Sequence, residues 1–125
     1  MTTNIHLFDQ TAEAIIFYAG ETIFFEGDMG DTMYVIREGE VDIVQDGFLV
    51  ETLGVGQVFG EMALIRNEPR MADAIARTDC VVMPIDARSF LHLIDTNRAF
   101  SLNIMRALCE RLLLTHVKIA APMIG

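Results

Sequence analysis

The chain has 125 residues, of which 52% are hydrophobic and 22% are charged, and its formal net charge is -9. This length and apolar content suffice for one globular domain with a single core and exclude a disordered chain. The acidic charge argues against a nucleic-acid surface, because phosphate backbones are held by clustered Lys and Arg, and only 9 such residues are spread along this chain. A small anion is still compatible, since one desolvated Arg in a pocket sets the local field whatever the net charge.

The cysteine content and the N-terminus bear on the compartment of the protein. Cys80 and Cys109 lie far apart without metal-ligand spacing, which indicates reduced thiols in an intracellular protein. The N-terminal residues lack a basic segment followed by an apolar stretch, and no apolar run approaches the roughly 20 residues that a membrane span needs. We therefore expect a soluble, cytoplasmic protein that contacts no membrane.

The first expected element is a short amphipathic helical segment over residues 5–18, where apolar side chains recur at helix-like intervals. From Gly20 onward, short apolar runs alternate with turn residues, which is typical of β-strands, and Asp46-Gly47 is a strong hairpin signal. Six of the predicted strands lie at residues 22–25, 33–37, 40–45, 48–53, 73–77 and 81–85. A total of about seven or eight strands without intervening helices predicts a mainly β fold, a jelly-roll barrel or double-stranded β-helix.

After residue 85 the periodicity becomes helical. Asp86 or Ser89 can cap a short helix, and Thr96 or Asn97 can open a longer one. The longer helix shows the alternating three- and four-residue steps of a two-stranded coiled coil. Its seam consists of Met105, Leu108, Leu112, Thr115 and Ile119. The seam predicts a homodimer through the C-terminal helix, and the alternative is that the stripe packs against the chain's own barrel.

We expect residues 1–125 to form one domain. The jelly roll is predicted at about residues 20–86, and a helical lid and dimerisation segment at about residues 87–120. Pro122 and Gly125 are expected to end the last helix.

Residues 59–73, FGEMALIRNEPRMAD, carry the chemistry. Gly60 permits close backbone approach, and residues 61–64 can form one helical turn whose free N–H groups point at an anion. Arg70 could donate paired hydrogen bonds to phosphate oxygens. Beside an anion the Glu61 carboxylate is repulsive unless it accepts hydrogen bonds, and a vicinal sugar hydroxyl is a suitable donor. Phosphate and ribose together indicate a nucleotide.

FGEMAL followed by PRMADA resembles the phosphate-binding cassette of the cyclic nucleotide-binding domain family, found in catabolite-activator-type regulators, cyclic-nucleotide-dependent kinases and gated channels. The family's earlier strands and turns are resembled, in the same order, by Gly20-Glu21, Glu26-Gly27-Asp28, Gly30-Asp31, Tyr34-Val35-Ile36 and Gly39-Glu40-Val41. The resemblance covers about residues 6–120. It implies a β jelly roll with a helical lid.

The resemblance also implies roles for single residues. Glu61 would bind the ribose 2′-hydroxyl and Arg70 the exocyclic oxygens of the cyclic phosphate. In activator-type members a threonine late in the long helix reaches the base, and Thr115 is similar to it. The other expected ligand-binding positions, which supply backbone or wall, are Gly60, Met62, Ala63, Met71 and Ala72.

Two positions depart from the commonest cassette. Met71 stands where cGMP-selective members carry a threonine and some cAMP receptors a serine, and a thioether forms no useful hydrogen bond to the ligand, which favours cAMP over cGMP. Asp73 stands where a threonine or another non-acidic residue is frequent. It would weaken binding if it faced the phosphate, whereas strand alternation puts it on the face opposite Arg70 unless a bulge intervenes.

The resulting hypothesis is a regulatory module that binds cAMP, less readily cGMP, and signals by movement of its C-terminal helices. The chain is expected to act through a downstream protein partner, through dimerisation, or as a fragment of a longer protein. One alternative is a ligand-free dimerisation or docking module on the same scaffold, and another is that Glu61 and Arg70 merely form a structural ion pair. Neither catalysis nor a metal or cofactor is expected, because no nucleophile-base pair is evident and the histidines are dispersed at His6, His92 and His116.

Overall fold

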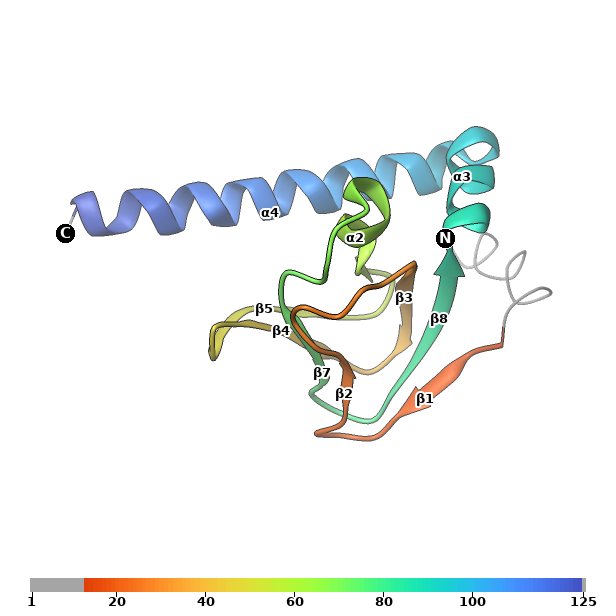
Figure 1. Cartoon of the computed structure of the whole chain (residues 1–125), viewed down its shortest axis with the longest axis horizontal. Helices are drawn as coiled ribbons and strands as arrows, with labels where there is room; N and C mark the ends of the chain where they lie inside the picture. Colours follow the sequence, from red (N-terminus) through yellow and green to blue (C-terminus); the bar gives the residue numbers. More distant parts are fainter. Residues whose placement is uncertain (1–12, 125) are drawn as a thin grey trace.

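Two four-stranded antiparallel sheets form the main body of the fold in the computed structural model, which describes the backbone of residues 13–124 and the side chains of residues 13–113 (Figure 1). The first sheet has the order β1 (Ile15–Phe17), β8 (Cys80–Asp86), β3 (Thr32–Glu38) and β6 (Val58–Phe59). The second has the order β2 (Thr22–Phe24), β7 (Asp73–Ala76), β4 (Val41–Gln45) and β5 (Phe48–Leu53). Apart from the β4–β5 hairpin, successive strands alternate between the two sheets, so the chain has the predicted jelly-roll arrangement.

The first sheet is buried on both faces. Toward the second sheet it packs the side chains of Ile36 and Val82, and toward the helices those of Met33 and Met83. Alternation along β3 and β8 sends neighbouring side chains to opposite faces, so both strands read as nearly continuous apolar runs. Each fully buried side chain of this kind stabilises the fold by about 1.5–3 kcal/mol. The sheet is therefore a rigid base between the second sheet and the helices.

In the described part of the chain, three helices follow or interrupt the strands. They are α2 (Glu61–Arg66), α3 (Ala87–Thr96) and α4 (Arg98–Ile124). Asp86 caps α3, because its carboxylate accepts a hydrogen bond from the Ser89 N–H at 2.8 Å. The Asn97 side chain likewise accepts from the Phe100 N–H at 2.9 Å where α4 begins. Figure 1 shows α4 running along one side of the barrel above α2, with its C-terminal end extending away from the strands.

Apolar side chains of α4 divide between two faces. Phe100 and Ile104 are buried beneath the helix, and Leu108 packs half-buried against the same cluster. The opposite face exposes Leu102, Met105, Cys109 and Leu112. Leu108 is therefore not a seam residue as predicted, because four-residue spacing from Phe100 and Ile104 keeps it over the barrel. The side chains of Thr115 and Ile119 lie outside the described residues.

The N-terminal helical prediction is wrong in its last part. Residues 5–12 lie outside the described residues, but Ile15–Phe17 is strand β1, and Ile16 pairs with Val81 of β8. A short apolar run cannot distinguish helix from strand by spacing alone, and an available sheet edge decides the outcome. At the other end, α4 continues to Ile124 and does not end at Pro122. A proline removes one backbone hydrogen bond and crowds the carbonyl four residues earlier, and so close to the end of a helix these effects do not stop the last turn from forming.

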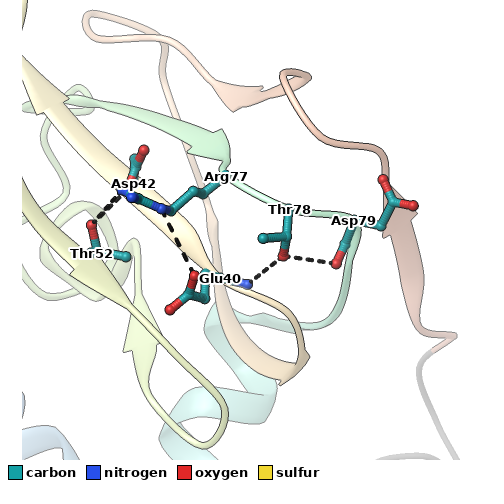
Figure 2. Close-up of polar contacts among 6 residues, drawn as sticks. All are labelled: Glu40, Asp42, Thr52, Arg77, Thr78 and Asp79. Carbon is teal, nitrogen blue, oxygen red and sulfur yellow. Dashed lines mark hydrogen bonds and ion pairs between the residues drawn. The ribbon is translucent and has the colours of Figure 1, made fainter.

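Polar side chains link the strands on the outer face of the second sheet (Figure 2). Arg77 lies 3.3 Å from the Asp42 carboxylate and 3.8 Å from that of Glu40, and Thr52 donates to Asp42 at 2.7 Å. The Glu40 N–H donates to the Thr78 hydroxyl at 3.0 Å. These groups are solvent-accessible, so each ion pair contributes at most about 1 kcal/mol. The network ties β4, β5 and the end of β7 together behind the cavity.

Candidate functional site

A cavity of about 480 Å³ opens between α2, the second sheet and α4. The segment around Arg70, the start of α2, strands β4 and β5 and one residue of α4 contribute to its lining. The lining residues used below are Gln45, Glu51, Gly60, Glu61, Met62, Ala63, Arg70, Met71, Ala72 and Arg111. Seven of the eight predicted ligand-binding residues therefore meet at one cavity. The eighth, Thr115, has its side chain outside the described residues.

Arg70 is a buried cation at one end of this cavity, only 6% exposed. Its Nη1 donates to the Gly60 carbonyl at 2.9 Å and its Nη2 to the Thr32 carbonyl at 2.6 Å. The guanidinium also lies 4.1 Å from the centre of the Phe24 ring, a distance at which the ring attracts a cation. Its Nε is buried without a hydrogen-bond partner among the described residues.

The surroundings of Arg70 favour an anion. Burial lowers the pKa of the Arg70 guanidinium, because removal from water disfavours the charged form, and nearby Tyr34 and Asp31 only partly offset this. Arginine nevertheless keeps its charge at neutral pH. A bound anion would replace the lost hydration and satisfy the free Nε.

Aromatic rings support the Phe24 side chain from behind. Phe24 packs against Phe59 with ring centres 6.0 Å apart and against Tyr34 at 6.3 Å. Phe59 is fully buried, and its ring lies 5.2 Å from that of Tyr34. Each offset ring contact of this kind stabilises the fold by about 0.5–1.5 kcal/mol, in addition to the stabilisation from the apolar area that it buries. The face on which the guanidinium lies is therefore held by the core.

The start of α2 adds backbone donors to the cavity. Gly60 precedes the helix with φ 83, a left-handed conformation that favours glycine, and no side chain caps the first turn. A Cβ at this position would also lie 2.8 Å from Nη1 of Arg70. The sequence prediction of one helical turn over residues 61–64 is confirmed, and the helix runs on to Arg66.

Glu61 is fully buried, with 0% exposure, and it does not pair with Arg70. Its Oε2 forms an ion pair with Nη1 of Arg111 from α4. Its Oε1 is buried without a hydrogen-bond partner among the described residues. The alternative of a structural Glu61–Arg70 pair is therefore wrong, and one carboxylate oxygen is left to accept a hydrogen bond from a ligand.

Arg111 is the functional candidate that the sequence reasoning missed. Its Nε lies 3.2 Å from the Glu51 carboxylate, and its Nη2 donates to the Val58 carbonyl at 3.3 Å. One side chain of α4 thus contacts both α2, through Glu61, and β5. The sequence could have indicated Arg111, because it lies four residues before the predicted ligand-binding residue Thr115 and therefore on the same face of the helix.

Asp73 lies at the start of β7 and not among the residues that line the cavity. Its Oδ1 accepts a hydrogen bond from the Glu26 N–H at 2.7 Å. The carboxylate is thus held by the loop between β2 and β3. It does not belong to the cavity wall that contains Arg70.

The arrangement can bind a small molecule that carries a negative charge and hydroxyl groups. A buried cation and a buried carboxylate each retain a polar atom without a hydrogen-bond partner among the described residues, and most of the remaining cavity lining is apolar. In the described part of the chain, no His, Cys, Asp or Glu side chains form a group of three suited to a metal ion. Nor does any described helix combine the length and apolar character that crossing a bilayer needs.

Comparison with known proteins identifies a matching family. The family model of the cyclic nucleotide-binding domain matches residues 14–97. The cAMP-dependent protein kinase regulatory subunit of Eremothecium gossypii is 41% identical over 75 residues, covering 60% of this chain and 16% of that protein. The corresponding subunit of Yarrowia lipolytica is 40% identical over 72 residues, covering 58% and 19%. The chain thus spans less than a fifth of the length of these curated relatives.

Solved structures share the fold. The Thermus thermophilus catabolite activator protein superposes with a TM-score of 0.80 at 24% identity, covering 98% of this chain and 60% of that chain. A cAMP-bound structure of PfPKA-R gives a TM-score of 0.69 at 27% identity, covering 90% and 37%. These likenesses confirm the predicted jelly roll with C-terminal helices.

Proposed function

Because the chain belongs to the cyclic nucleotide-binding domain family, we propose that it is a regulatory binding module, not an enzyme, whose cavity takes up cAMP. The observation that carries this proposal is the pair of unsatisfied buried atoms, Nε of Arg70 and Oε1 of Glu61. A cyclic phosphate supplies the acceptor that the first atom lacks, and a ribose hydroxyl supplies the donor that the second lacks.

The proposed pose follows the order of groups along the cavity. The phosphate would lie between Arg70 and the first turn of α2, and the ribose 2′-hydroxyl would donate to Glu61. The base would then lie toward Gln45 and Met71, both of which line the cavity. Thr115 would reach the base from α4.

The proposed preference for cAMP over cGMP rests on Met71. Its side chain lines the cavity and is 54% exposed, so it offers the base an apolar surface without a hydroxyl group. A thioether is a weak acceptor and donates no hydrogen bond. The cavity therefore lacks, at this position, the hydroxyl that a guanine base would use.

The signal would pass through Arg111. In the structure this side chain is bound to Glu61 and Glu51, so α4 is linked to the same carboxylate that the ribose would use. A ribose hydroxyl that donates to Oε1 of Glu61 would draw on the charge of the same carboxylate that holds Arg111 through Oε2, and this would shift the equilibrium position of α4 over the cavity. The ligand thus acts on the helix through a shared carboxylate.

We also propose that the module forms a homodimer through α4. The exposed stripe of Leu102, Met105, Cys109 and Leu112 follows three- and four-residue steps, which is the spacing of a two-stranded coiled-coil seam. Movement of α4 would then reach a second copy or a downstream protein partner.

Isothermal titration calorimetry with cAMP tests the phosphate role. Arg70→Ala should weaken binding by about 1.5–3 kcal/mol, the scale of a hydrogen bond to a charged group. Arg66→Ala is the matched control, because Arg66 is 58% exposed, pairs with Glu68 and does not line the cavity. Unchanged affinity in Arg70→Ala would remove Arg70 from the site.

The ribose role has its own test in the ligand. 2′-Deoxy-cAMP should bind at least about tenfold more weakly than cAMP, because Glu61 would keep its unsatisfied oxygen. Equal affinity would remove the assignment of Glu61. If wild type gives no heat with either cAMP or cGMP at millimolar concentration but remains a stable dimer, the ligand-free docking module is the better description.

A further inference from the structure

The loop between β2 and β3 runs beside Arg70. Its backbone is paired with that of Arg70 in both directions: the Gly27 N–H donates to the Arg70 carbonyl at 2.8 Å, and the Arg70 N–H donates to the Asp28 carbonyl at 2.8 Å. The Asp73 carboxylate fixes the same loop through the Glu26 N–H at 2.7 Å. Residues 25–31 are therefore attached to the strand segment on both sides of Arg70.

Gly30 of this loop lies directly against the guanidinium. A Cβ atom placed on Gly30 would be 2.2 Å from Nε, 2.3 Å from Cζ and 2.4 Å from Nη2 of Arg70. These distances are far below any van der Waals contact, so a side chain at Gly30 and the guanidinium cannot occupy their present positions together. Gly30 has no positive φ, which means that space around Arg70, and not backbone conformation, requires glycine here.

We propose that the β2–β3 loop is a second wall of the phosphate site, with Gly30 and Asp73 as positioning residues for Arg70. The inference rests on the proposed function, because it concerns the same guanidinium. Because Gly30 has no side chain, it leaves room for the guanidinium. Asp73 holds the loop, through the Glu26 N–H, in the position that keeps this room open.

The wall explains how one long side chain is held in a single orientation. The guanidinium touches Gly30, lies over Phe24 and donates to the carbonyls of Gly60 and Thr32. Loop, ring and carbonyls together fix its plane before any ligand arrives, which reduces the entropy lost on binding. Asp73 thus acts on the phosphate site indirectly, because its carboxylate holds the backbone of the β2–β3 loop that lies against Arg70.

The geometry can be tested without any nucleotide. In the unliganded protein the Arg70 Nε–Hε resonance should carry a ring-current shift from Phe24 in ¹H–¹⁵N spectra. Gly30→Ala should move or broaden this resonance, because the added methyl displaces the guanidinium. Gly54→Ala is the matched control, since Gly54 also has no positive φ and a Cβ there meets only the Gln57 side chain at 4.0 Å. An unmoved resonance in Gly30→Ala would overturn the proposal.

A double-mutant cycle tests the functional consequence. Gly30→Ala should raise the Kd for cAMP about tenfold or more, which corresponds to about 1.4 kcal/mol. In an Arg70→Ala background the same substitution should change the Kd by less than about twofold, because Gly30 acts only through Arg70. Equal effects in the two backgrounds would contradict the positioning role. Thermal unfolding of each variant separates this result from loss of the fold.

The role of Asp73 as an anchor for the loop can be tested by comparing Asp73→Asn, which keeps a hydrogen-bond acceptor, with Asp73→Ala, which does not. Asp73→Asn retains an oxygen that can accept from the Glu26 N–H and should keep the Arg70 resonance and the Kd near those of wild type. Asp73→Ala should shift the resonance and weaken binding. If Asp73→Ala leaves both the Arg70 resonance and the Kd unchanged, Asp73 does not serve as an anchor for the loop.

The two proposals fail in different measurements. Absence of cyclic-nucleotide binding by wild type would refute the proposed function, while the spectra of the unliganded variants would still decide whether the loop positions Arg70. Normal binding by wild type and by Gly30→Ala would refute the wall and leave the proposed function intact.

Discussion

Glu61 and Arg111 show how a single buried charge links two distant parts of the chain. The carboxylate has no exposure to solvent, whereas 24% of the Arg111 side chain is exposed. A buried carboxylate costs several kcal/mol unless a cation and hydrogen bonds compensate it. Glu61 is thus tolerable in the unliganded fold because α4 supplies Arg111.

Arg111→Met should therefore destabilise the protein. Removal of one partner from a fully buried pair costs about 3–5 kcal/mol, and the partial exposure of Arg111 reduces this to about 1–3 kcal/mol. Glu61→Gln in the same chain should restore most of the loss, because no charge then remains buried. Urea denaturation measures both values, with exposed Arg106→Met as the control. A double variant no more stable than Arg111→Met alone would contradict this account.

The residues of the site differ in how far the sequence predicted them. The cassette order predicted a shared ligand site for Gly60, Glu61 and Arg70, and all three line one cavity, because a short loop and a helical turn keep near neighbours together. Arg111 was missed, since its approach to Glu61 depends on the path of α4 across the barrel. The direction of Asp73 was left open because the loop that receives its carboxylate lies 47 positions earlier in the chain.

Among the elements, α3 depends on a charged cap. The backbone N–H of Ser89 donates to the Asp86 carboxylate, and this hydrogen bond is the main reason that the pKa of Asp86 is lowered. A carboxyl group whose pKa is lowered by folding stabilises the folded state at every pH above its unfolded-state pKa of 3.8. This stabilisation is lost as the pH falls through the folded-state pKa.

Asp86→Ala should cost about 1 kcal/mol at neutral pH, the usual value of an N-cap. The difference in unfolding free energy between wild type and this variant should shrink as the pH is lowered below 3.8. Asp86→Asn keeps a neutral acceptor, so its stability relative to Asp86→Ala should not change over the same range. Urea titrations at neutral and acidic pH provide the values. A constant difference between wild type and Asp86→Ala would exclude the charged cap.

Secondary-structure elements were predicted correctly where the hydrophobic pattern was long, and they were missed for the short strands at the edges of the first sheet. The alternation in β4 and the Asp46-Gly47 turn gave the hairpin correctly, because one face of β4 must be buried and the turn requires a positive φ at Asp46. Strand β1 was missed because only three residues pair with β8. Strand β6 is shorter still, with two residues, and carries no periodicity of its own.

For the whole molecule, the exposed stripe on α4 predicts the oligomeric state. Met105 is 58% exposed at the middle of the stripe, and a charge placed there would be buried in a coiled-coil seam. Met105→Glu should therefore convert a dimer to a monomer in analytical ultracentrifugation. Ala99→Glu is the matched control, because Ala99 is also exposed on α4 but lies off the stripe. Dimers in both variants would place the interface elsewhere.

The C-terminal part of α4 extends beyond Arg111 and away from the strands (Figure 1). From Arg111 to Ile124 the helix continues for about 20 Å at 1.5 Å per residue. A tilt of about 10° about Arg111 would move the tip by about 3.5 Å, a displacement large enough to change how a neighbouring helix packs. If a ligand on Glu61 weakens the hold of that carboxylate on Arg111, as we propose, α4 would tilt about Arg111 and the tip of the helix would move by this distance.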